Sequence, residues 1–506
     1  MFIQRLKNFY HLLVAVGANF FYGFPSRKLF VIGVTGTNGK TITVQMINGV
    51  LEEAGHKTGM VSTINFQIGK RKWVNKTKFT TINSIAHQKF LAQCVKEKCE
   101  FVVIETSSHA LDQNRVWGTD YDIGVITNVT REHLDYHRTM GKYRQAKLKL
   151  FKFLAGKKTS FKNGREAGFS VINLSMEKPE EFITENPAKS YGYLMTDSNS
   201  LNSNSLDSNS SASSSLNSHH LNSHSPKANS LDSNSSNLDD SGSSVSLEYG
   251  ATSLKQKVEM KAEEKIKLIK DPKHLLQAQD IELKQSGSLF KIAEEEYRLK
   301  LPGLFNIENA LATIWVGKIL KIDNQIIKRA LASIKKVPGR MDDVSNDKGI
   351  EIIIDYALTP DSMEKVGQLL RSKLSKVVDN QARLYWVFGS CGQRDRGKRP
   401  IMGKIVAKYA DVIIVTNEDP YYEDPQQIID EIFEGVTAGG KIEGKNAFRV
   451  MNRREAIKKA LISADRGDIV VITGKGAEEN MKVGNKLIEW NDKKVVKELL
   501  KKIETG

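Results

Sequence analysis

The chain has 506 residues, of which 75 are Lys or Arg and 59 are Asp or Glu, so its formal net charge is +16. The excess is mostly lysine, is spread along the chain and comes without a zinc-knuckle or RNP-type motif, so we expect anionic small substrates and no nucleic acid. The three cysteines form no C-x-x-C pair, which argues against a disulfide framework or a four-cysteine zinc site and favours a reducing cytoplasm. The length predicts about three units once unstructured segments are removed.

Residues 1–29 predict an N-terminal amphipathic helix. The stretch 9–24 is rich in Phe, Leu and Val and follows Arg5 and Lys7, but polar interruptions leave it short of the about 20 apolar residues that span a bilayer. It also lacks a persuasive signal-peptide cleavage site. The helix therefore either packs on the protein or makes peripheral contact with a membrane through residues 1–25.

A glycine-rich turn follows the first predicted strand, in the run Val31-Ile-Gly-Val-Thr-Gly-Thr-Asn-Gly-Lys-Thr41. Gly36 and Gly39 let backbone N–H groups surround phosphate oxygens, Lys40 supplies a positive charge, and the hydroxyl of Thr41 can bind Mg²⁺ at a helix N-terminus. The spacing departs from the strict phosphate-loop pattern, because Val34 stands where its first glycine should be. A glycine-rich turn without a ligand is the alternative, but the flanking strand and helix favour an ATP-using protein.

Short apolar strands alternate with helical stretches from residue 30 onward, which is typical of a parallel sheet with covered faces. We place a central ATP-binding domain at residues 30–337. Its predicted elements include strands at 30–34, 101–105, 123–128, 170–174, 281–292 and 297–301, a helix at 41–54, and a helix that opens in the run 302–312.

A polar tract interrupts this domain at about residues 196–246, where Ser, Asn, Leu and Asp repeat in an S-L-x-S-N-S pattern. Such a composition cannot bury enough apolar area to offset its ordering entropy, so we predict a disordered insert. The fold tolerates it because loop-closure entropy grows only logarithmically with length.

A second α/β domain is predicted at residues 338–506, with strands at 350–355, 383–388, 411–416 and 469–473, each followed by a stretch compatible with a helix. The predicted fold class is therefore α/β. It comprises a central P-loop-type parallel-sheet ATPase domain, a disordered Ser/Asn-rich insert and a C-terminal Rossmann-like domain.

Polar residues follow two of the central strands. Glu105 ends one strand, and His133, Asp135 and His137 follow the next, so all should reach the rim where open α/β sheets hold ligands. Glu105 is a candidate Mg²⁺ ligand. Each histidine taken alone is better explained as a hydrogen-bonded structural residue, but the clustering beside a phosphate loop favours a site.

These motifs, in this order from about residue 30 to the C-terminus, resemble the ATP-dependent Mur ligases, and most closely the MurE-type branch that adds the third peptide residue. The loops 389–400 and 474–478 are similar to the arginine-rich and amino-acid-binding loops of that branch. The resemblance implies an enzyme of cytoplasmic peptidoglycan synthesis with ATP and Mg²⁺ as cofactors. It would join an amino acid to a UDP-N-acetylmuramoyl-dipeptide through an acyl phosphate.

The resemblance also implies residue roles. The ATP-binding residues would be Gly36, Thr37, Asn38, Gly39, Lys40, Thr41, Asn309, Arg340 and Asp355. The catalytic residues would be Lys40, Glu105, His133 and Lys147, and the metal-binding set would be Thr41, Glu105, His133 and Lys147, where Lys147 matches the lysine that the family carbamylates. The substrate-binding residues would be Thr80, Thr81, Ser107, Arg115, Asp419, Tyr421 and Glu478.

Three positions depart from the family pattern. Leu358 and Ala477 replace histidines, and Tyr421 replaces the arginine that recognises the carboxylate of meso-diaminopimelate. Because tyrosine cannot form a bidentate carboxylate clamp, we predict that diaminopimelate is not the preferred amino acid and that lysine or another residue is.

About thirty residues precede the first strand, where the family has a domain that binds uridine diphosphate, so we expect that domain to be missing. Either the remaining contacts hold the acceptor, or the acceptor is a different muramyl peptide, such as a lipid-linked one. Alternative functions are a folylpolyglutamate synthase-like ligase, a Mur-ligase-like subunit of a lipid II amidating complex, and a non-catalytic ATP-binding scaffold. The sequence leaves the oligomeric state open.

Overall fold

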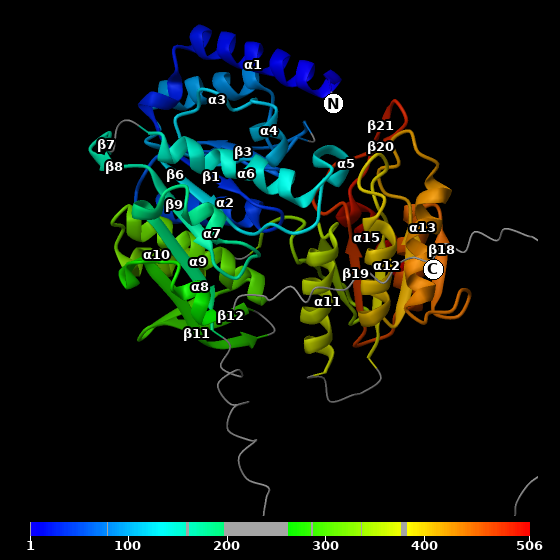
Figure 1. Ribbon diagram of the computed structural model, residues 1–506. Coiled ribbons are helices and arrows are strands. Elements are labelled where there is room, and N and C mark those ends of the chain that lie inside the picture. Colours follow the sequence, from blue (N-terminus) through cyan, green and yellow to red (C-terminus); the bar gives the residue numbers. More distant parts are fainter. Residues whose placement is uncertain are drawn as a thin grey trace, which may run out of the picture. The chain divides into compact units, whose positions relative to one another are not determined.

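Figure 1 shows the computed structural model. It describes residues 2–77, 79–157, 161–196, 262–284, 287–334, 336–375 and 382–505. These residues belong to one compact unit. Apart from Thr196, the predicted insert lies outside the described residues. Within the part of the chain that is described, no helix combines the length and the apolarity needed to cross a bilayer.

An eleven-stranded sheet forms the first half of the fold, in the order β13-β12-β11-β10-β9-β6-β1-β5-β2-β3-β4. Its middle strands, from β11 to β2, pair in parallel, and antiparallel hairpins close both edges. The strands are β1 (Phe30–Thr35), β2 (Thr58–Val61), β3 (Asn65–Ile68), β4 (Arg71–Val74), β5 (Phe101–Glu105), β6 (Ile123–Ile126), β9 (Phe169–Asn173), β10 (Ser190–Met195), β11 (Leu275–Lys284), β12 (Gly287–Ile292) and β13 (Glu295–Leu299). A separate small hairpin consists of β7 (Phe161–Lys162) and β8 (Arg165–Glu166).

Helices cover both faces of this sheet, which explains why its central strands β1, β5, β6 and β9 are buried along their whole length. One hydrophobic core lies between the sheet and α2, α9 and α10, and the other lies under α3, α4, α6 and α7. The helices are α1 (Phe2–Tyr22), α2 (Lys40–Glu53), α3 (Ser84–Lys96), α4 (Ser108–Asp112), α5 (Leu134–His137), α6 (Met140–Ala155), α7 (Glu180–Ile183), α8 (Ala262–Ile266), α9 (Leu304–Ile319) and α10 (Asn324–Ser333).

A six-stranded sheet, in the order β14-β15-β19-β16-β17-β18, forms the second half. The α11, α12 and α13 helices cover one face of it, and α14 and α15 cover the other. The elements are β14 (Asp342–Val344), β15 (Glu351–Asp355), α11 (Pro360–Leu374), β16 (Leu384–Phe388), α12 (Lys398–Tyr409), β17 (Val412–Thr416), α13 (Pro425–Ala438), β18 (Ala447–Val450), α14 (Arg453–Ser463), β19 (Ile469–Thr473), β20 (Asn480–Val483), β21 (Lys486–Glu489) and α15 (Asp492–Thr505).

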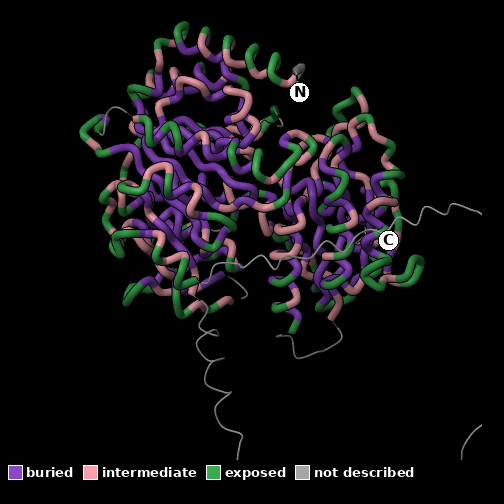
Figure 2. Tube along the Cα trace, viewed as in Figure 1, coloured by how far each residue is buried: buried purple, intermediate pink, exposed green. Residues whose placement is uncertain are grey.

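The predicted α/β class with two parallel-sheet halves is confirmed, and Figure 2 shows the buried residues gathered along both sheets. One predicted strand is wrong, because residues 281–292 contain the end of β11 and all of β12, which pair antiparallel. In the sequence, several polar residues interrupt that run, which reads IELKQSGSLFKI.

Candidate active site

The turn after β1 has the shape expected of a phosphate-binding loop. All six residues of β1 are buried, and the chain reaches α2 through Gly36 (φ +149°) and Gly39 (φ +84°). A Cβ atom at Gly36 would lie 1.8 Å from Thr127 Oγ1, and one at Gly39 would lie 2.4 Å from Asn309 Oδ1. Only glycine fits this conformation and these close approaches, which leave the loop's N–H groups clear of side chains.

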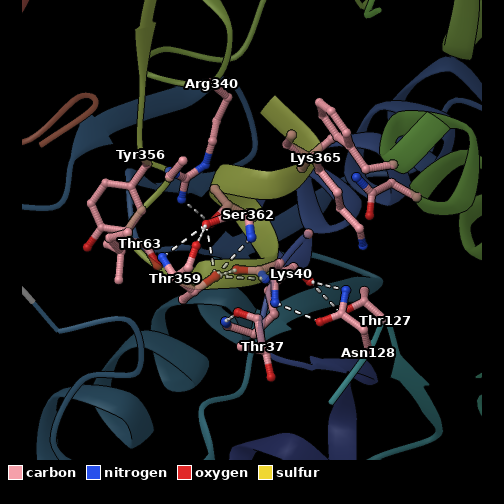
Figure 3. Close-up of a pocket in the computed structure, with 18 of the residues that line it drawn as sticks. Thr37, Lys40, Thr63, Thr127, Asn128, Arg340, Tyr356, Thr359, Ser362 and Lys365 are labelled. Atoms are coloured by element: carbon pink, nitrogen blue, oxygen red, sulfur yellow. Dashed lines mark hydrogen bonds between the residues drawn. The ribbon is translucent and has the colours of Figure 1, made fainter. Parts of the chain in front are cut away.

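Hydrogen bonds from the end of β6 brace the loop (Figure 3). The Asn38 backbone N–H donates to Asn128 Oδ1 at 2.9 Å, and Thr127 Oγ1 donates to the Asn38 carbonyl at 2.6 Å. Lys40 Nζ donates to the Thr37 carbonyl at 2.8 Å. Burial lowers the pKa of Lys40, with Glu105 opposing this shift, so an anionic phosphate at the loop would favour the charged amine.

Oxygen ligands converge beside the loop. Thr41 Oγ1 donates to Glu105 Oε2 at 3.0 Å, at the start of α2 and the end of β5. Glu105 also accepts bonds from Thr63, from its backbone N–H at 2.7 Å and from Oγ1 at 2.9 Å. Glu105 is buried, so this carboxylate is held in one orientation facing the loop.

Lys147 approaches the same loop from α6. Its Nζ donates to the Gly36 carbonyl at 2.7 Å and lies 4.2 Å from the ring centroid of Tyr143. Burial, together with the nearby charge of Lys40, lowers the pKa of Lys147 well below its usual value. A lowered pKa makes the neutral, nucleophilic form of this amine more accessible, which suits the carbamylation that the family resemblance implies.

His133 lines the cavity from the other side of the loop. It has a left-handed backbone (φ +56°), and its buried Nδ1 atom has no hydrogen-bond partner in the described structure. Burial and the neighbouring His109 lower its pKa well below the ordinary range. The adjacent Glu132 is buried and pairs with Lys398 Nζ at 3.1 Å, which joins this loop to the start of α12.

Residues after residue 338 complete the site. Arg340 Nη2 donates to Thr41 Oγ1 at 3.3 Å, and its guanidinium lies 4.2 Å from the centroid of the Tyr356 ring. Asp355 accepts backbone bonds from Met341 and Ala357, each at 2.7 Å. Burial raises the pKa of Asp355, and the charge of Arg340 opposes this.

The two halves share one cavity of about 210 Å³ (Figure 3). Predicted residues that line it are Thr37, Asn38, Gly39, Lys40, Thr41, Thr80, Glu105, His133, Asn309, Arg340 and Asp355. Gly36 and Lys147 are in contact just behind the loop. Of the predicted histidine and aspartate cluster, Asp135 and His137 are outside the cavity lining, and His137 Nε2 instead lies 3.1 Å from Ser108 Oγ.

The predicted acceptor residues form a second group beyond Glu105. Thr81 Oγ1 donates to the Glu105 carbonyl at 2.8 Å and lies 3.2 Å from Ser107 Oγ. Arg115 Nη1 donates to the Thr81 carbonyl, and its buried Nε has no hydrogen-bond partner among the described residues. Thr80 joins this group to the cavity, because Thr63 Oγ1 donates to Thr80 Oγ1 at 3.1 Å.

Two of the predicted amino-acid-binding residues are joined by Lys475, whose amine donates to both Asp419 and Glu478. Glu478 lines a small pocket beside the cavity and accepts a bond from the Tyr356 hydroxyl at 3.1 Å. Asp419 is buried and accepts a hydrogen bond from Lys475 Nζ at 2.9 Å. Tyr421 has a left-handed backbone (φ +54°), and its ring centroid lies 5.7 Å from the Arg394 guanidinium.

Several site residues escaped the sequence analysis. These are Thr63, Asn128, Glu132, Tyr356, Thr359 and Lys398. Thr63 follows β2, a strand that was not predicted because it is short and contains Gly59. The position of Thr63 shortly after a strand was the signal that could have identified it. The pairing of Glu132 with Lys398 could not be predicted, because it leaves no pattern in the local sequence.

The residues present fit ATP and Mg²⁺. A hydroxyl and a carboxylate are the hard oxygen ligands that Mg²⁺ prefers, and it usually keeps waters and phosphate oxygens as its other ligands. Among the described residues, no group of three or more His, Cys, Asp or Glu side chains is placed to hold a metal ion. The Thr41 hydroxyl, the Glu105 carboxylate and the His133 imidazole are the groups that would face Mg²⁺.

Comparisons with known proteins agree with this geometry. Residues 34–236 match the Mur ligase middle domain, and residues 339–476 match the glutamate ligase domain of Mur ligases. The UDP-N-acetylmuramoyl-L-alanyl-D-glutamate–2,6-diaminopimelate ligase of Syntrophomonas wolfei is 34% identical over 491 residues, which are 97% of this chain and 81% of the relative. The enzyme of the same name from Geobacillus thermodenitrificans is 33% identical over 494 residues, with 96% and 82% coverage.

Solved structures give the same fold. A structure of a ligase with that name has a TM-score of 0.51 and 26% identity, and covers 94% of this chain and 79% of its own. Mycobacterium tuberculosis folylpolyglutamate synthase complexed with ADP has a TM-score of 0.61, but its 13% identity shows the fold alone. The chain therefore belongs to the Mur ligase family of ATP-dependent, amide-bond-forming ligases, and its relatives place it in the MurE branch.

Proposed function

We propose that this protein uses ATP to add the third amino acid to UDP-N-acetylmuramoyl-L-alanyl-D-glutamate, in the cytoplasmic stage of peptidoglycan synthesis. The observation that carries the proposal is the convergence of Lys40, Thr41, Glu105 and Arg340 on one cavity. The acceptor group formed by Thr81, Ser107 and Arg115 adjoins it. The free state of all three cysteines is in keeping with a reducing compartment.

In this proposal, bound Mg²⁺-ATP would transfer its γ-phosphoryl group to the acceptor carboxylate and leave ADP. The incoming amine would then attack the resulting acyl phosphate and expel inorganic phosphate as the amide bond forms. The loop N–H groups and Lys40 hold the phosphates and neutralise their charge. Arg340 adds a second positive charge from the C-terminal half, while Thr41 and Glu105 hold the metal. These side chains position and neutralise the reactants, which is most of what phosphoryl transfer requires of a protein.

Arg115 is the residue that we assign to the acceptor's carboxylate. Burial lowers its pKa to about 10, so it stays charged at neutral pH. Its Nη1 is held by the Thr81 carbonyl, and its Nε is buried without a hydrogen-bond partner in the described structure. A guanidinium N–H in this state is suited to a carboxylate that arrives with the substrate.

For the amino acid, we propose lysine or another residue without a second carboxylate. The relatives named above are diaminopimelate ligases by name, but Tyr421 and Ala477 remove two side chains of the family's recognition pattern. The small pocket beside Tyr356 is lined by Glu478 and Glu479, together with Lys76 and Arg340. Its acidic residues favour a cationic side chain, and its basic ones favour a single α-carboxylate.

The test is phosphate release by the purified protein with Mg²⁺-ATP, UDP-N-acetylmuramoyl-L-alanyl-D-glutamate and a panel of amino acids, with product masses measured in parallel. A new peptide bond would support the proposed reaction and identify the amino acid. Robust turnover with diaminopimelate and none with lysine would contradict the specificity. Absence of turnover with every amino acid, despite ATP binding, would contradict the soluble acceptor and favour a lipid-linked one.

A further inference from the structure

The α1 helix is attached to the protein by its polar side. Gln4 Nε2 donates to the Tyr136 hydroxyl at 3.0 Å, and Asn8 Nδ2 donates to the Asp112 carbonyl at 3.1 Å. Asn19 is fully buried and donates to the Trp117 carbonyl at 2.7 Å. These residues share one face of the helix, since their spacing follows its 3.6-residue period, and that face packs against α3 (Figure 1).

The opposite face is apolar and exposed, which is the reverse of the usual arrangement for a helix on the surface of a globular protein. Figure 2 shows exposed residues along the outer side of α1. The large apolar side chains on it, with their exposed fractions, are Leu6 (61%), Phe9 (58%), Tyr10 (64%), Leu13 (54%), Phe20 (69%) and Phe21 (82%). We call this set the α1 outer face. A contiguous apolar stripe of this kind marks an interaction surface.

The basic residues around the α1 outer face indicate which kind of partner it binds. No Asp or Glu precedes Glu52 in the chain, whereas Arg5, Lys7, Arg27 and Lys28 are all exposed. Arg5 and Lys7 are on the two flanks of the stripe, at helical angles of about 100° on either side of its centre. Apolar and aromatic residues flanked by basic ones are typical of a helix that lies in the plane of an anionic bilayer surface.

We propose that the α1 outer face docks this protein on an anionic phospholipid surface, with the helix parallel to the membrane plane. Phe9, Leu13 and Phe20 would enter the boundary between headgroups and acyl chains, while the basic residues contact lipid phosphates. Hydrogen bonds from Asn8 and Asn19 already fix α1 on the protein. The helix therefore loses no folding entropy when it binds the membrane. The inference is independent of the proposed ligase activity, because none of these residues lines the catalytic cavity.

Vesicle flotation of the full chain tests this. We expect the protein to float with phosphatidylglycerol vesicles at low salt and to float little with vesicles of pure phosphatidylcholine. High salt should weaken its binding to the phosphatidylglycerol vesicles. The double variant Phe9→Glu/Phe20→Glu should lose about tenfold or more of its partitioning into anionic vesicles. The matched control is Ile462→Glu, a 55%-exposed apolar residue on α14, which should bind as the unmodified protein does.

Separate controls test the contribution of the basic residues to binding and whether each variant still folds. Arg5→Gln/Lys7→Gln should weaken binding to anionic vesicles only, and thermal unfolding of each variant should match the unmodified protein because the replaced side chains are exposed. Absence of flotation with anionic vesicles, or equal flotation of the Phe9→Glu/Phe20→Glu variant, would overturn the proposal. A dimer in sedimentation velocity that this variant dissociates, without vesicle binding, would instead assign the face to a second copy.

Discussion

Two amines, those of Lys40 and Lys147, contact the same short loop, and partial or full removal from water lowers the pKa of both. The surroundings of the two amines suit different chemistry. Lys40 faces the cavity, whereas Lys147 lies behind the loop against Tyr143 and the Gly36 carbonyl. The first is therefore suited to a phosphate and the second to a covalent modification that converts a buried cation into an anion.

Replacing Lys147 tests that difference. We expect Lys147→Ala to lower kcat about a hundredfold or more, because an anion that supports the metal would be lost, while ATP binding is retained. Isotopically labelled bicarbonate should mark the unmodified protein and not this variant. The control is Lys149→Ala on the same helix, whose ammonium pairs with Asp112 and is partly exposed. Full activity of Lys147→Ala would remove Lys147 from the mechanism.

Tyr421 is the residue at which the proposed specificity departs from that of the named relatives. We expect Tyr421→Arg to raise the use of diaminopimelate relative to lysine, because a guanidinium there can form two parallel hydrogen bonds to a carboxylate. The comparison is Tyr422→Arg, next in sequence and 63% exposed, which should leave the ratio unchanged. Equal amino-acid preference of the two variants would exclude position 421 from recognition.

At the scale of elements, the starts of α14 and α15 are joined by a buried ion pair. Arg453 Nε and Nη2 donate to the Asp492 carboxylate at 2.9 and 2.7 Å, and both side chains are almost completely buried. Arg453 also donates to the Thr473 carbonyl at the end of β19. One guanidinium thus fixes two helices and a strand.

Removing that guanidinium should be costly. We expect Arg453→Ala to lower the free energy of unfolding by about 3–5 kcal/mol, because the Asp492 carboxylate would stay buried without its partner. The neighbouring Arg454→Ala serves as control. Its partner Glu498 is 57% exposed, so the change should cost less than about 1 kcal/mol. Chemical denaturation of both variants measures the difference, and equal losses would contradict the burial argument.

The elements that carry the site were largely predictable. Buried strands such as β1 and β19 have continuous β-branched or apolar runs, and the glycines at 36 and 39 identify the loop that follows β1. Hairpins at the sheet edges were harder, because β11 alternates apolar and polar residues and is only partly buried. The prediction there merged two antiparallel strands into one.

At the scale of the whole molecule, the sequence could not supply contacts between distant residues. The amide of Asn38 donates to Asp361 at 2.7 Å, and Arg131 Nε donates to Asp395 at 3.0 Å, across more than 250 positions of sequence in each case. Neither pair has a local pattern, since each residue alone resembles a solvated surface group. The residue roles that rest on family resemblance stay predictions, and the cavity explains why these residues would act together.

Global stability should depend on pH through buried histidines, of which His87 is the clearest. It is fully buried, its Nε2 lies 3.0 Å from Thr119 Oγ1, and burial lowers its pKa from 6.5 to about 4. Because the unfolded chain binds the proton more readily, this residue's contribution is complete above pH 6.5 and is lost as pH falls toward 4. At about 1.4 kcal/mol per pH unit, the loss reaches about 3 kcal/mol.

His87→Gln should therefore flatten the fall in unfolding free energy between pH 6.5 and 4, since glutamine can bond Thr119 without titrating. Urea denaturation at several pH values measures both slopes, and their difference is unaffected by any uniform loss that the substitution causes. A variant whose stability falls as steeply as that of the unmodified protein would show that His87 is already protonated when folded, and that acid unfolding begins at other groups.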